Sequence, residues 1–528
     1  MKEKSNFLKS SVLPAILLIL SVTGTFFFYA SRATWVFMDI TVGFEQFAFL
    51  LLCIMIANTV LLGSLSFFNM KKDKNDPKLF CNKKAYRVLL GFSGVIGVIL
   101  FVFSMIFSLS MAFSESGEVY WLYFRKSLFK GAFLTMLPCF VLFFEKMGKK
   151  TKAAVGTAAI VAVFAITFFE FYPAINYRIT SEPTVFDTGK NYSVVFSVSS
   201  NGTGFVEYNY EGKNYKVFDE SGGRLNSSSK IHSVNIPYEH LENNSYKIGS
   251  TQVTEQYSYG SRTGKEVVSG EYNFVPAKGS NMTCLVISDW HTRLGLAKDA
   301  IGYAGDYDSV ILLGDSTPGV DFEEQVVNNI VRFAGDVSKG TKPVLFVRGN
   351  HETRGEYAGE ILGALGLDEF YYTARMGEFS FVVLDSGEDK DDSHPEYGGM
   401  TDYNTYRAKM IEWLSGVETN NEKVIALSHS WKISDVENEL SEKGWNELDR
   451  LGARLMISGH THQCRLIGEA DEREKEVFSA HPEITGYMDG GHTDGVYTAS
   501  KLTLTDKDIL IEAFNNSGEK VFEHKLDW

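Results

Sequence analysis

The sequence predicts a multi-domain protein with an N-terminal α-helical membrane region, a β-sandwich and a C-terminal α/β domain. Three observations predict this organisation. Long apolar segments fill residues 1–175, residues alternate with period two over 180–278, and short apolar runs alternate with helical stretches over 281–528. The formal net charge of −14 combines a basic, apolar N-terminal part with an acidic remainder. That acidic remainder argues against nucleic acid as a partner.

The N-terminal region contains five apolar segments, each close to the ~20 residues that a helix needs to cross a bilayer. They are Ser10–Ala30, Phe44–Phe68, Val88–Phe113, Ser127–Phe144 and Ala153–Tyr172. We therefore expect a bundle of five transmembrane helices, with the lipid bilayer as its partner. No charged residue lies at the centre of a segment, so the bundle is expected to serve as an anchor.

The basic residues predict how this bundle is oriented. They gather at the N-terminus and in the loops after the second and fourth segments, whereas the alternate loops contain only Arg32, Arg125 and Lys126. Lysine and arginine are enriched in cytoplasmic loops. We expect a multi-pass plasma-membrane protein with a cytoplasmic N-terminus, in which the residues after about 172 are extracytoplasmic.

Residues 180–278 have the pattern of half-buried strands. Tyr192–Val198 and Phe205–Tyr210 alternate in polarity, and glycine-containing turns separate such runs. This pattern is typical of an immunoglobulin-like or fibronectin-like β-sandwich. We interpret it as a spacer domain, with a ligand-binding face on its Tyr-rich strands as the alternative.

In the C-terminal region, polar residues follow a series of apolar runs that read as buried strands. Asp289 and His291 follow Thr283–Ser288, and similar runs precede the other polar residues: Asp315, Asn350, His429, His460 and His462. Ligands in α/β sheets collect at the carboxyl ends of strands. Carboxylate, amide and imidazole groups suit Mn²⁺, Fe or Zn²⁺ better than Ca²⁺. The order of these motifs predicts a centre for two divalent metal ions.

This ordered set of motifs resembles the calcineurin-like metallophosphoesterase superfamily over Met282–Trp528. The upstream β-rich region resembles the arrangement of purple acid phosphatases, and Leu384–Lys390 with His394–Gly399 is similar to a segment of bacterial members. The resemblance implies a four-layer α/β/β/α sandwich with a two-metal site at one edge, and it favours a bacterial source.

The resemblance also implies a role for each metal ligand. Asp289, His291 and His462 would hold the first ion. Asn350, His429 and His460 would hold the second, and Asp315 would bridge both. Purple acid phosphatases have an iron-binding Tyr where this chain has Pro318, which puts ferric chemistry in doubt.

The chemistry that the resemblance implies is attack on phosphorus by a metal-bridging hydroxide. His351 is expected to protonate the leaving oxygen, with a loop-fixing role as the alternative, and His394 is the other candidate acid. Asn350, His351 and Arg348 are the candidate substrate contacts, although Arg348 also reads as an ordinary surface residue. Glu352 is expected to orient His351, and the glycine-rich segment around His481 and His492 to form a rim loop.

Taken together, the sequence predicts a membrane-anchored extracytoplasmic phosphoesterase whose substrate is a phosphate ester, most simply a phosphomonoester. A phosphodiesterase and a lipid-linked pyrophosphate hydrolase share the same motifs and are the alternatives within the enzyme class. A non-catalytic, receptor-like ectodomain is the alternative of another class. It is disfavoured because every expected ligand position is filled. The oligomeric state is left open.

Overall fold

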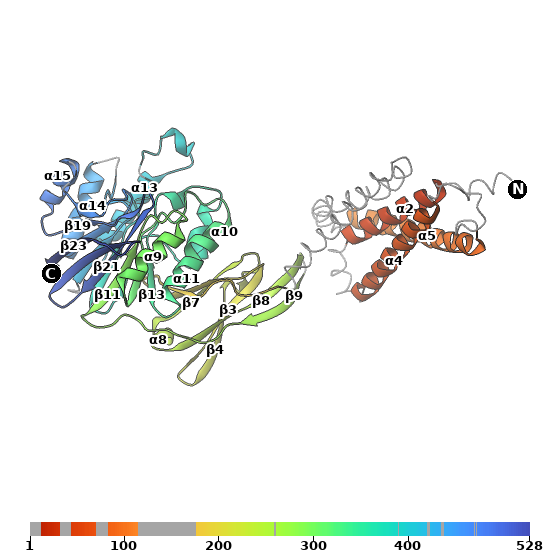
Figure 1. The fold of residues 1–528 in the computed structure, drawn as a ribbon, viewed down its shortest axis with the longest axis horizontal. Helices are drawn as coiled ribbons and strands as arrows, with labels where there is room; N and C mark the ends of the chain where they lie inside the picture. The colour runs from red at the N-terminus through yellow and green to blue at the C-terminus, as the bar shows by residue number, and fades with distance from the viewer. Residues whose placement is uncertain are drawn as a thin grey trace. The chain divides into compact units, whose positions relative to one another are not determined.

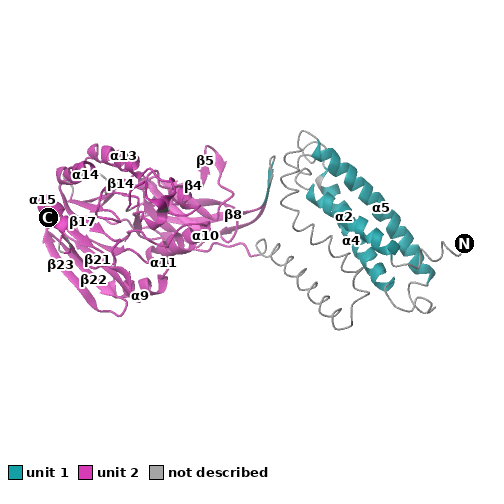
Figure 2. Ribbon diagram, turned by 90° about the horizontal axis from the view of Figure 1, so that it is seen from above, with its two compact units in different colours: residues 1–171, 255–262 teal, residues 172–254, 263–528 magenta. Residues whose placement is uncertain are grey.

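A computed structural model describes most of the chain. The described residues are 12–31, 44–69, 83–113, 176–257, 260–388, 390–419, 423–434, 438–468, 470 and 472–528. The chain forms two compact units, residues 1–171 with 255–262, and residues 172–254 with 263–528 (Figure 2).

The first unit contains three long helices among its described residues: α2 (Val12–Ala30), α4 (Glu45–Asn69) and α5 (Lys84–Ala112) (Figure 1). All three are long and apolar enough to cross a membrane. They match the first three predicted segments. The other two, Ser127–Phe144 and Ala153–Tyr172, lie outside the described residues.

Small and polar side chains lie where these three helices meet. The hydroxyls of Ser21 and Thr59 lie 2.8 Å apart between α2 and α4, and Ser93 of α5 donates to Asn58 at 2.6 Å. Gly97 allows α5 to come close to the Asn58 amide. Small residues and hydrogen bonds of this kind hold helices together in an apolar solvent.

The largest sheet of the second unit has ten strands in the order β23-β22-β21-β11-β12-β13-β1-β2-β7, with β20 paired to β21. Their bounds are β1 (Thr184–Asp187), β2 (Tyr192–Ser197), β7 (Ile231–Ile236), β11 (Met282–Ile287), β12 (Ser309–Leu312), β13 (Pro343–Phe346), β20 (Gly491–Thr493), β21 (Val496–Leu504), β22 (Asp508–Asn515) and β23 (Lys520–Asp527). The central strands β11, β12 and β13 are parallel neighbours, so their carboxyl ends meet at one edge.

A second sheet has six strands in the order β14-β15-β16-β17-β19-β18. Their bounds are β14 (Tyr372–Met376), β15 (Phe379–Val383), β16 (Lys423–Leu427), β17 (Ala453–Ser458), β18 (Arg465–Ile467) and β19 (Thr485–Met488). Strands β15, β16, β17 and β19 run parallel. Because parallel strands are buried on both faces, their sequences are almost continuously apolar.

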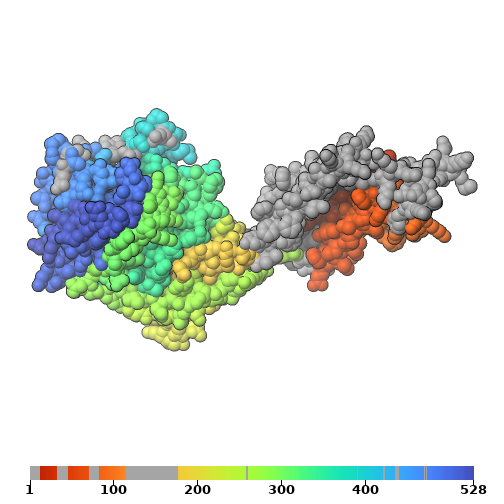
Figure 3. All heavy atoms as spheres, in the orientation of Figure 1, coloured from red at the N-terminus to blue at the C-terminus, as the bar shows by residue number. Residues whose placement is uncertain are grey.

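The helices form the outer layers around these two sheets. Their bounds are α9 (Leu294–Ala304), α10 (Glu323–Val326), the π-helix η2 (Val327–Val331), α11 (Arg332–Ser338), η3 (His351–Thr353), η4 (Ala358–Glu360), α12 (Ile361–Ala364), η5 (Pro395–Tyr397), α13 (Tyr403–Ser415), α14 (Asn438–Leu451) and α15 (Glu472–Ala480). In the space-filling view the blue C-terminal strands lie beside the green residues near α9, as the pairing of β11 with β21 requires (Figure 3).

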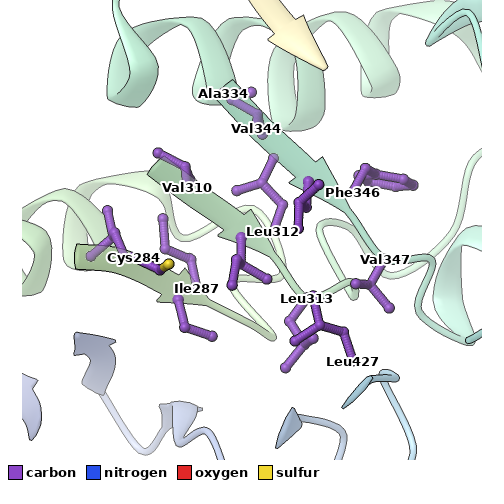
Figure 4. Close-up of a cluster of buried hydrophobic side chains, with 14 of the residues drawn as sticks. Cys284, Ile287, Val310, Leu312, Leu313, Ala334, Val344, Phe346, Val347 and Leu427 are labelled. Atoms are coloured by element: carbon purple, nitrogen blue, oxygen red, sulfur yellow. The ribbon is translucent and has the colours of Figure 1, made fainter. Parts of the chain in front are cut away.

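The buried side chains show how the layers stack. One cluster joins Phe333 of α11 and Leu312 of β12 to Phe381 of β15, so the two sheets pack face to face under the helices. Figure 4 shows part of this cluster around Leu312 and Phe346. A second cluster joins Val382 on the opposite face of β15 to Trp445 of α14. The order of layers is therefore helix, sheet, sheet, helix, as the sequence predicts.

The β-rich region differs from the separate spacer that the sequence suggests. Strands β1, β2 and β7 extend the ten-stranded sheet, and β1 pairs in parallel with β13, with Val185 opposite Pro343. The remaining strands form a five-stranded sheet and a small ribbon: β3 (Gly202–Tyr210), β4 (Lys213–Phe218), β8 (Ser245–Tyr257), β9 (Gly260–Val268) and β10 (Tyr272–Asn273), then β5 (Glu220–Ser221) and β6 (Arg224–Leu225). The short helix α8 (Tyr238–Leu241) lies between β7 and β8.

These two parts of the β-rich region share one apolar core. Phe196 of β2 and Val234 of β7 pack in the same cluster as Val206 of β3 and Ile248 of β8. The region is thus sandwich-like, but one of its sheets is the edge of the ten-stranded sheet. The structure does not confirm an immunoglobulin-like or fibronectin-like domain over 180–278. The reason is that the fully buried strand β1 finds its partner in β13.

Candidate metal centre

All seven predicted metal ligands lie just after a strand. Asp289 and His291 follow β11, Asp315 follows β12, and Asn350 follows β13. His429 follows β16, while His460 and His462 follow β17. The two parallel sets of strands thus deliver these side chains from two packed sheets to one rim.

Hydrogen bonds between the strand-end loops join the two sheets at this rim. The Asp289 N–H donates to the Gly314 carbonyl at 2.9 Å within the ten-stranded sheet. The His460 N–H, from the other sheet, donates to Asp289 Oδ2 at 3.0 Å. The loops are therefore held at fixed positions before any ligand binds.

Asp289, His291 and His462 form the first cluster of metal-binding atoms, which lie within 4.8 Å of one another. His462 Nε2 lies 3.3 Å from Asp289 Oδ1. The rings of His291 and His462 stack, with their centroids 5.2 Å apart. These are the three residues expected to hold the first ion.

Asp315, His429 and His460 form the second cluster. His429 Nε2 lies 3.2 Å from Asp315 Oδ2, and His460 Nδ1 lies 3.1 Å from the Asn350 side-chain oxygen. The same Asp315 Oδ2 lies 3.7 Å from His291 Nε2, in the first cluster. Asp315 thus stands between the two clusters, where a bridging carboxylate is expected.

In three of the site histidines, a contact with a backbone carbonyl determines which ring nitrogen carries the proton. His429 Nδ1 lies 2.7 Å from the Leu313 carbonyl, His351 Nδ1 lies 2.8 Å from that of Pro318, and His462 Nδ1 contacts that of His492. A carbonyl only accepts, so each Nδ1 carries the proton. Each Nε2 is then the nitrogen that faces the centre, which is how histidine ligands are commonly oriented.

Backbone strain is concentrated at this rim. Five ligand residues have a left-handed backbone conformation, with φ between +37° and +74°: Asp289, His291, Asp315, His460 and His462. Residues with a Cβ rarely adopt this conformation, which costs about 1–3 kcal/mol each and clusters at functional sites. The surrounding hydrogen bonds hold the strained loops in place.

The electrostatics of the cluster favour a bound cation. Burial lowers the pKa of His291 to about 4, so its ring is neutral near pH 7 and can offer a lone pair. Burial also opposes charge on His429, but the carboxylates of Asp315 and Asp289 outweigh it and raise its pKa to about 10. His429 and His351 in turn hold the pKa of Asp315 below its ordinary value, although burial opposes this.

The donor atoms fit divalent metal ions. Asp289 Oδ1 and His429 Nε2 are both buried, lie 4.0 Å from each other and have ion-pair neighbours in the site but no hydrogen bond of good geometry. A buried polar atom left in this way is costly unless something binds it. Carboxylate oxygens, an amide oxygen and imidazole nitrogens suit Mn²⁺, Fe or Zn²⁺.

Glu352 has a wider role than orienting His351. Its fully buried carboxylate accepts hydrogen bonds from the backbone N–H groups of Asp315 and Gly349, both at 2.9 Å, and from that of Ser316 at 2.6 Å. It therefore clamps the loop after β12 to the loop after β13. Burial, reinforced by the nearby Asp315, raises the pKa of Glu352.

Asp489 is a buried carboxylate at the rim that the sequence analysis did not single out. It follows β19, which runs parallel to β17, and its Oδ2 accepts a hydrogen bond from Ser288 at 2.7 Å. Burial, opposed by two serine hydroxyls, raises its pKa to about 7. An acidic residue directly after the short run Thr485–Met488 was the available signal, but that run is mixed and the glycines around it made the segment read as a loop.

The structure places the expected substrate contacts differently. His351 lies at the centre, with Nε2 3.8 Å from Asp315 Oδ2 and part of its side chain exposed. Arg348 instead forms a buried ion pair with Asp385 at 2.6 Å and stacks on Phe370. Its guanidinium is therefore engaged in the interior rather than presented to phosphate.

Of the three other histidines singled out in the sequence, one lies at the rim of the candidate centre. His394 belongs to none of the metal-binding clusters found among the described residues, and its ring lies 5.9 Å from that of Tyr397. His481 pairs with Asp449 at 2.5 Å. Only His492 reaches the rim, through the contact of its carbonyl with His462.

Comparisons with known proteins agree with the geometry. The model of the calcineurin-like phosphoesterase family matches residues 282–464. No curated protein matches the chain. Several solved structures resemble it at low sequence identity.

Among these structures is that of PhoD, with 11% identity, a TM-score of 0.38, and coverage of 66% of this chain and 90% of the other. Another is GAP50, the anchor in the inner membrane complex of Plasmodium, with 13% identity, a TM-score of 0.33 and coverage of 47% and 89%. A metallophosphoesterase from Sphaerobacter thermophilus has 14% identity, a TM-score of 0.23 and coverage of 47% and 89%.

The family assignment thus rests on the match of the family model and on the metal-binding clusters at the strand ends. Residues 282–464 form a calcineurin-like phosphoesterase domain.

Proposed function

We propose that this protein is a membrane-anchored phosphomonoesterase that acts outside the cytoplasm with two divalent metal ions. One observation carries the proposal. The Asp315 carboxylate lies between two clusters of metal-binding side chains, 3.7 Å from His291 on one side and 3.2 Å from His429 on the other. A shared carboxylate between two sets of ligands is the arrangement that two-ion phosphoesterases need.

The residues of the proposed centre have different roles in the reaction. Two divalent ions held by these side chains would supply Lewis-acid stabilisation of the phosphoryl oxygens and lower the pKa of water. Asp315 would reduce the repulsion between the two positive charges. Asn350, buried beside His460, presents its amide at the edge of the second position, where it can also contact substrate. The clamp formed by Glu352 keeps both loops in register.

His351 is the best placed residue to protonate the leaving oxygen. Its Nδ1 donates to the Pro318 carbonyl, which fixes the ring, while the other nitrogen faces the centre. The side chain is 27% exposed, so a substrate oxygen can approach it. A proton on Nε2 would pass to the departing alkoxide, which is the role of a general acid.

The anchor and the location rest on the first unit. Three helices are long and apolar enough to cross a membrane, and the basic residues of the sequence favour a cytoplasmic N-terminus. Protease added to intact cells that express the full-length protein should degrade the phosphoesterase domain. Protection of that domain in intact cells, with cleavage only after lysis, would contradict the proposed location.

The catalytic part of the proposal is tested with the detergent-solubilised full-length protein. The protein is stripped of metal, reloaded with Mn²⁺, Zn²⁺ or Fe²⁺, and assayed with para-nitrophenyl phosphate and with bis(para-nitrophenyl) phosphate. We expect metal-dependent turnover with the monoester favoured. Turnover should be lost in Asp315→Asn and retained in Asp506→Asn, which changes an exposed carboxylate in the turn after β21.

Two results would change the proposal. Preference for the bis-ester would make the protein a phosphodiesterase, with the centre unchanged. No turnover of either ester with any of the three metals, in a folded protein, would contradict a phosphoesterase acting on simple esters.

A further inference from the structure

The segment Asp489–His492, called the turn below, follows β19, includes the first two residues of β20 and lies beyond the residues that the family model matches. It contributes no residue to the candidate metal-binding clusters found among the described residues. It nevertheless supports the first cluster of candidate ligands at three points: one acts through the neighbouring Ser288, and two are direct contacts with Asp289 and His462.

The first point is the Asp489 carboxylate, which is fully buried. It accepts a hydrogen bond from the hydroxyl of Ser288 at 2.7 Å and another from that of Ser500. Its own N–H donates to the Ser458 carbonyl at 2.7 Å. Ser288 directly precedes the ligand Asp289, and Ser458 ends the strand that leads to His460 and His462, so this one residue ties two ligand-bearing strands together.

The second point is Gly491, whose backbone lies against Asp289. Its φ is +56°, and a Cβ built on it would lie 2.5 Å from Asp289 Cβ and 3.1 Å from the Ser288 carbonyl oxygen. Only glycine allows so close an approach. The third point is the His492 carbonyl, which accepts the Nδ1 proton of His462 and so turns His462 Nε2 toward Asp289.

The other cluster has different supports. His429 is oriented by the Leu313 carbonyl, and the loops that bear Asp315 and Asn350 are clamped by Glu352. The contacts described for the turn Asp489–His492 do not include His429 or Asn350. The link from the turn to the second cluster is indirect, because Asp489 holds Ser458, two residues before His460, whereas Gly491 and His492 contact Asp289 and His462 of the first cluster directly.

We propose that the turn Asp489–His492 positions Asp289 and His462, and thereby affects the affinity of the first ion position more strongly than that of the second. Asp489 is a positioning residue in this arrangement. The inference rests on the proposed two-ion centre, and it adds to that proposal a structural reason for the two ions to bind with separable affinities.

The test measures metal binding rather than turnover. Metal-stripped full-length protein is titrated with Mn²⁺ in the presence of a competing chelator, and bound metal is determined by mass spectrometry. Electron paramagnetic resonance then distinguishes a coupled pair of Mn²⁺ ions from an isolated one. We expect Asp489→Asn to lower the affinity for one of the two Mn²⁺ ions roughly 10–100-fold. This is the usual effect of losing a residue that supports a metal ligand. At intermediate Mn²⁺ the variant should show the signal of an isolated ion.

Two serines give a matched pair of milder variants. Ser288 and Ser500 are both fully buried, and both donate a hydroxyl hydrogen bond to Asp489. Only Ser288 adjoins a metal ligand. We expect Ser288→Ala to lower the affinity for the same Mn²⁺ ion as Asp489→Asn does. Ser500→Ala should lower that affinity much less. This pair provides the answer even if Asp489→Asn does not fold.

A further control separates positioning from general destabilisation. Asp187 is another buried carboxylate, held by Tyr238 and the Gly189 N–H rather than by residues of the centre. Asp187→Asn should retain both ions with wild-type affinity.

The outcomes distinguish this inference from the proposed function. A wild-type protein that does not bind two ions would overturn the two-ion centre itself. Two ions in the wild type, with equal effects of Ser288→Ala and Ser500→Ala on both ions, would overturn the inference alone. Wild-type affinities in both Asp489→Asn and Ser288→Ala would overturn it as well.

Discussion

Replacing Glu352 with Gln tests whether one buried carboxylate holds the two loops of the centre together. Glu352 accepts four hydrogen bonds. Its Oε2 takes the N–H groups of Asp315 and Gly349, both at 2.9 Å, and its Oε1 takes the N–H of Ser316 at 2.6 Å and the Ser316 hydroxyl at 2.5 Å. All four groups are donors, and a glutamine has an acceptor at only one of its two positions.

The size of the effect follows from this count. The amide is expected to place its NH₂ group at the Oε1 position, where the Ser316 hydroxyl can turn to accept from it, so the hydrogen bond from the Ser316 N–H is the one that is lost. A hydrogen bond to a charged group contributes about 1.5–3 kcal/mol. We therefore expect Glu352→Gln to lower the free energy of unfolding by about 1.5–3 kcal/mol. The loops would also move relative to each other, and a shift of about 1 Å at a reacting centre can cost about 100-fold in rate.

The assay compares urea unfolding of the full-length protein in detergent, followed by tryptophan fluorescence, with turnover of para-nitrophenyl phosphate. Glu360→Gln is the matched control, since Glu360 is an exposed glutamate in the neighbouring turn η4. A Glu352→Gln protein that matches Glu360→Gln in both stability and turnover would refute the clamp.

Three further results are expected. His351→Gln should lower kcat by roughly 10²–10⁴-fold with an alkyl phosphate but far less with para-nitrophenyl phosphate, whose leaving group needs no proton; equal losses in kcat for both esters would contradict its role as the acid. Burial raises the pKa of Asp187 to about 6 from an ordinary 3.8, so the folded state binds this proton more tightly than the unfolded state. Stability should then fall by about 3 kcal/mol as the pH rises from 4 to above 6, and this dependence should be missing from unfolding curves of Asp187→Asn. Arg348→Ala should destabilise the protein by about 3–5 kcal/mol, because it leaves Asp385 buried without its partner, while KM for the monoester changes little; a large rise in KM without loss of stability would instead indicate phosphate binding.

The strands and the positions of the candidate metal ligands at their ends could be predicted because their signals are local. A buried parallel strand is a short apolar run, and a ligand at its end is a polar residue of a type that binds metal. Thr283–Ser288 followed by Asp289 shows both signals at once, and the structure has β11 over Met282–Ile287. The same reasoning located the strand before His429 at Lys423–Leu427, which is where β16 lies.

The features that were missed depend on contacts between distant residues. Arg348 follows a strand beside the ligand loop, and only the fold brings it to Asp385, whose carboxylate pairs with it. Asp489 follows a strand whose pattern, Thr-Gly-Tyr-Met, is too short and mixed to read as buried. The pairing of β1 with β13 joins residues far apart in the sequence, and the alternation within Thr184–Asp187 carries no information on its partner.

That pairing has a consequence for how the phosphoesterase domain can be isolated. A fragment that begins at residue 281 would lose β1, β2 and β7, leaving the backbone N–H and carbonyl groups of one side of β13 without partners. It would also uncover apolar side chains such as Phe346, which packs edge-on against Phe186 of β1. Exposed strands of this kind invite pairing with other chains and aggregation. The smallest fragment of the second unit expected to stay soluble therefore begins before Thr184 and includes the β-rich region.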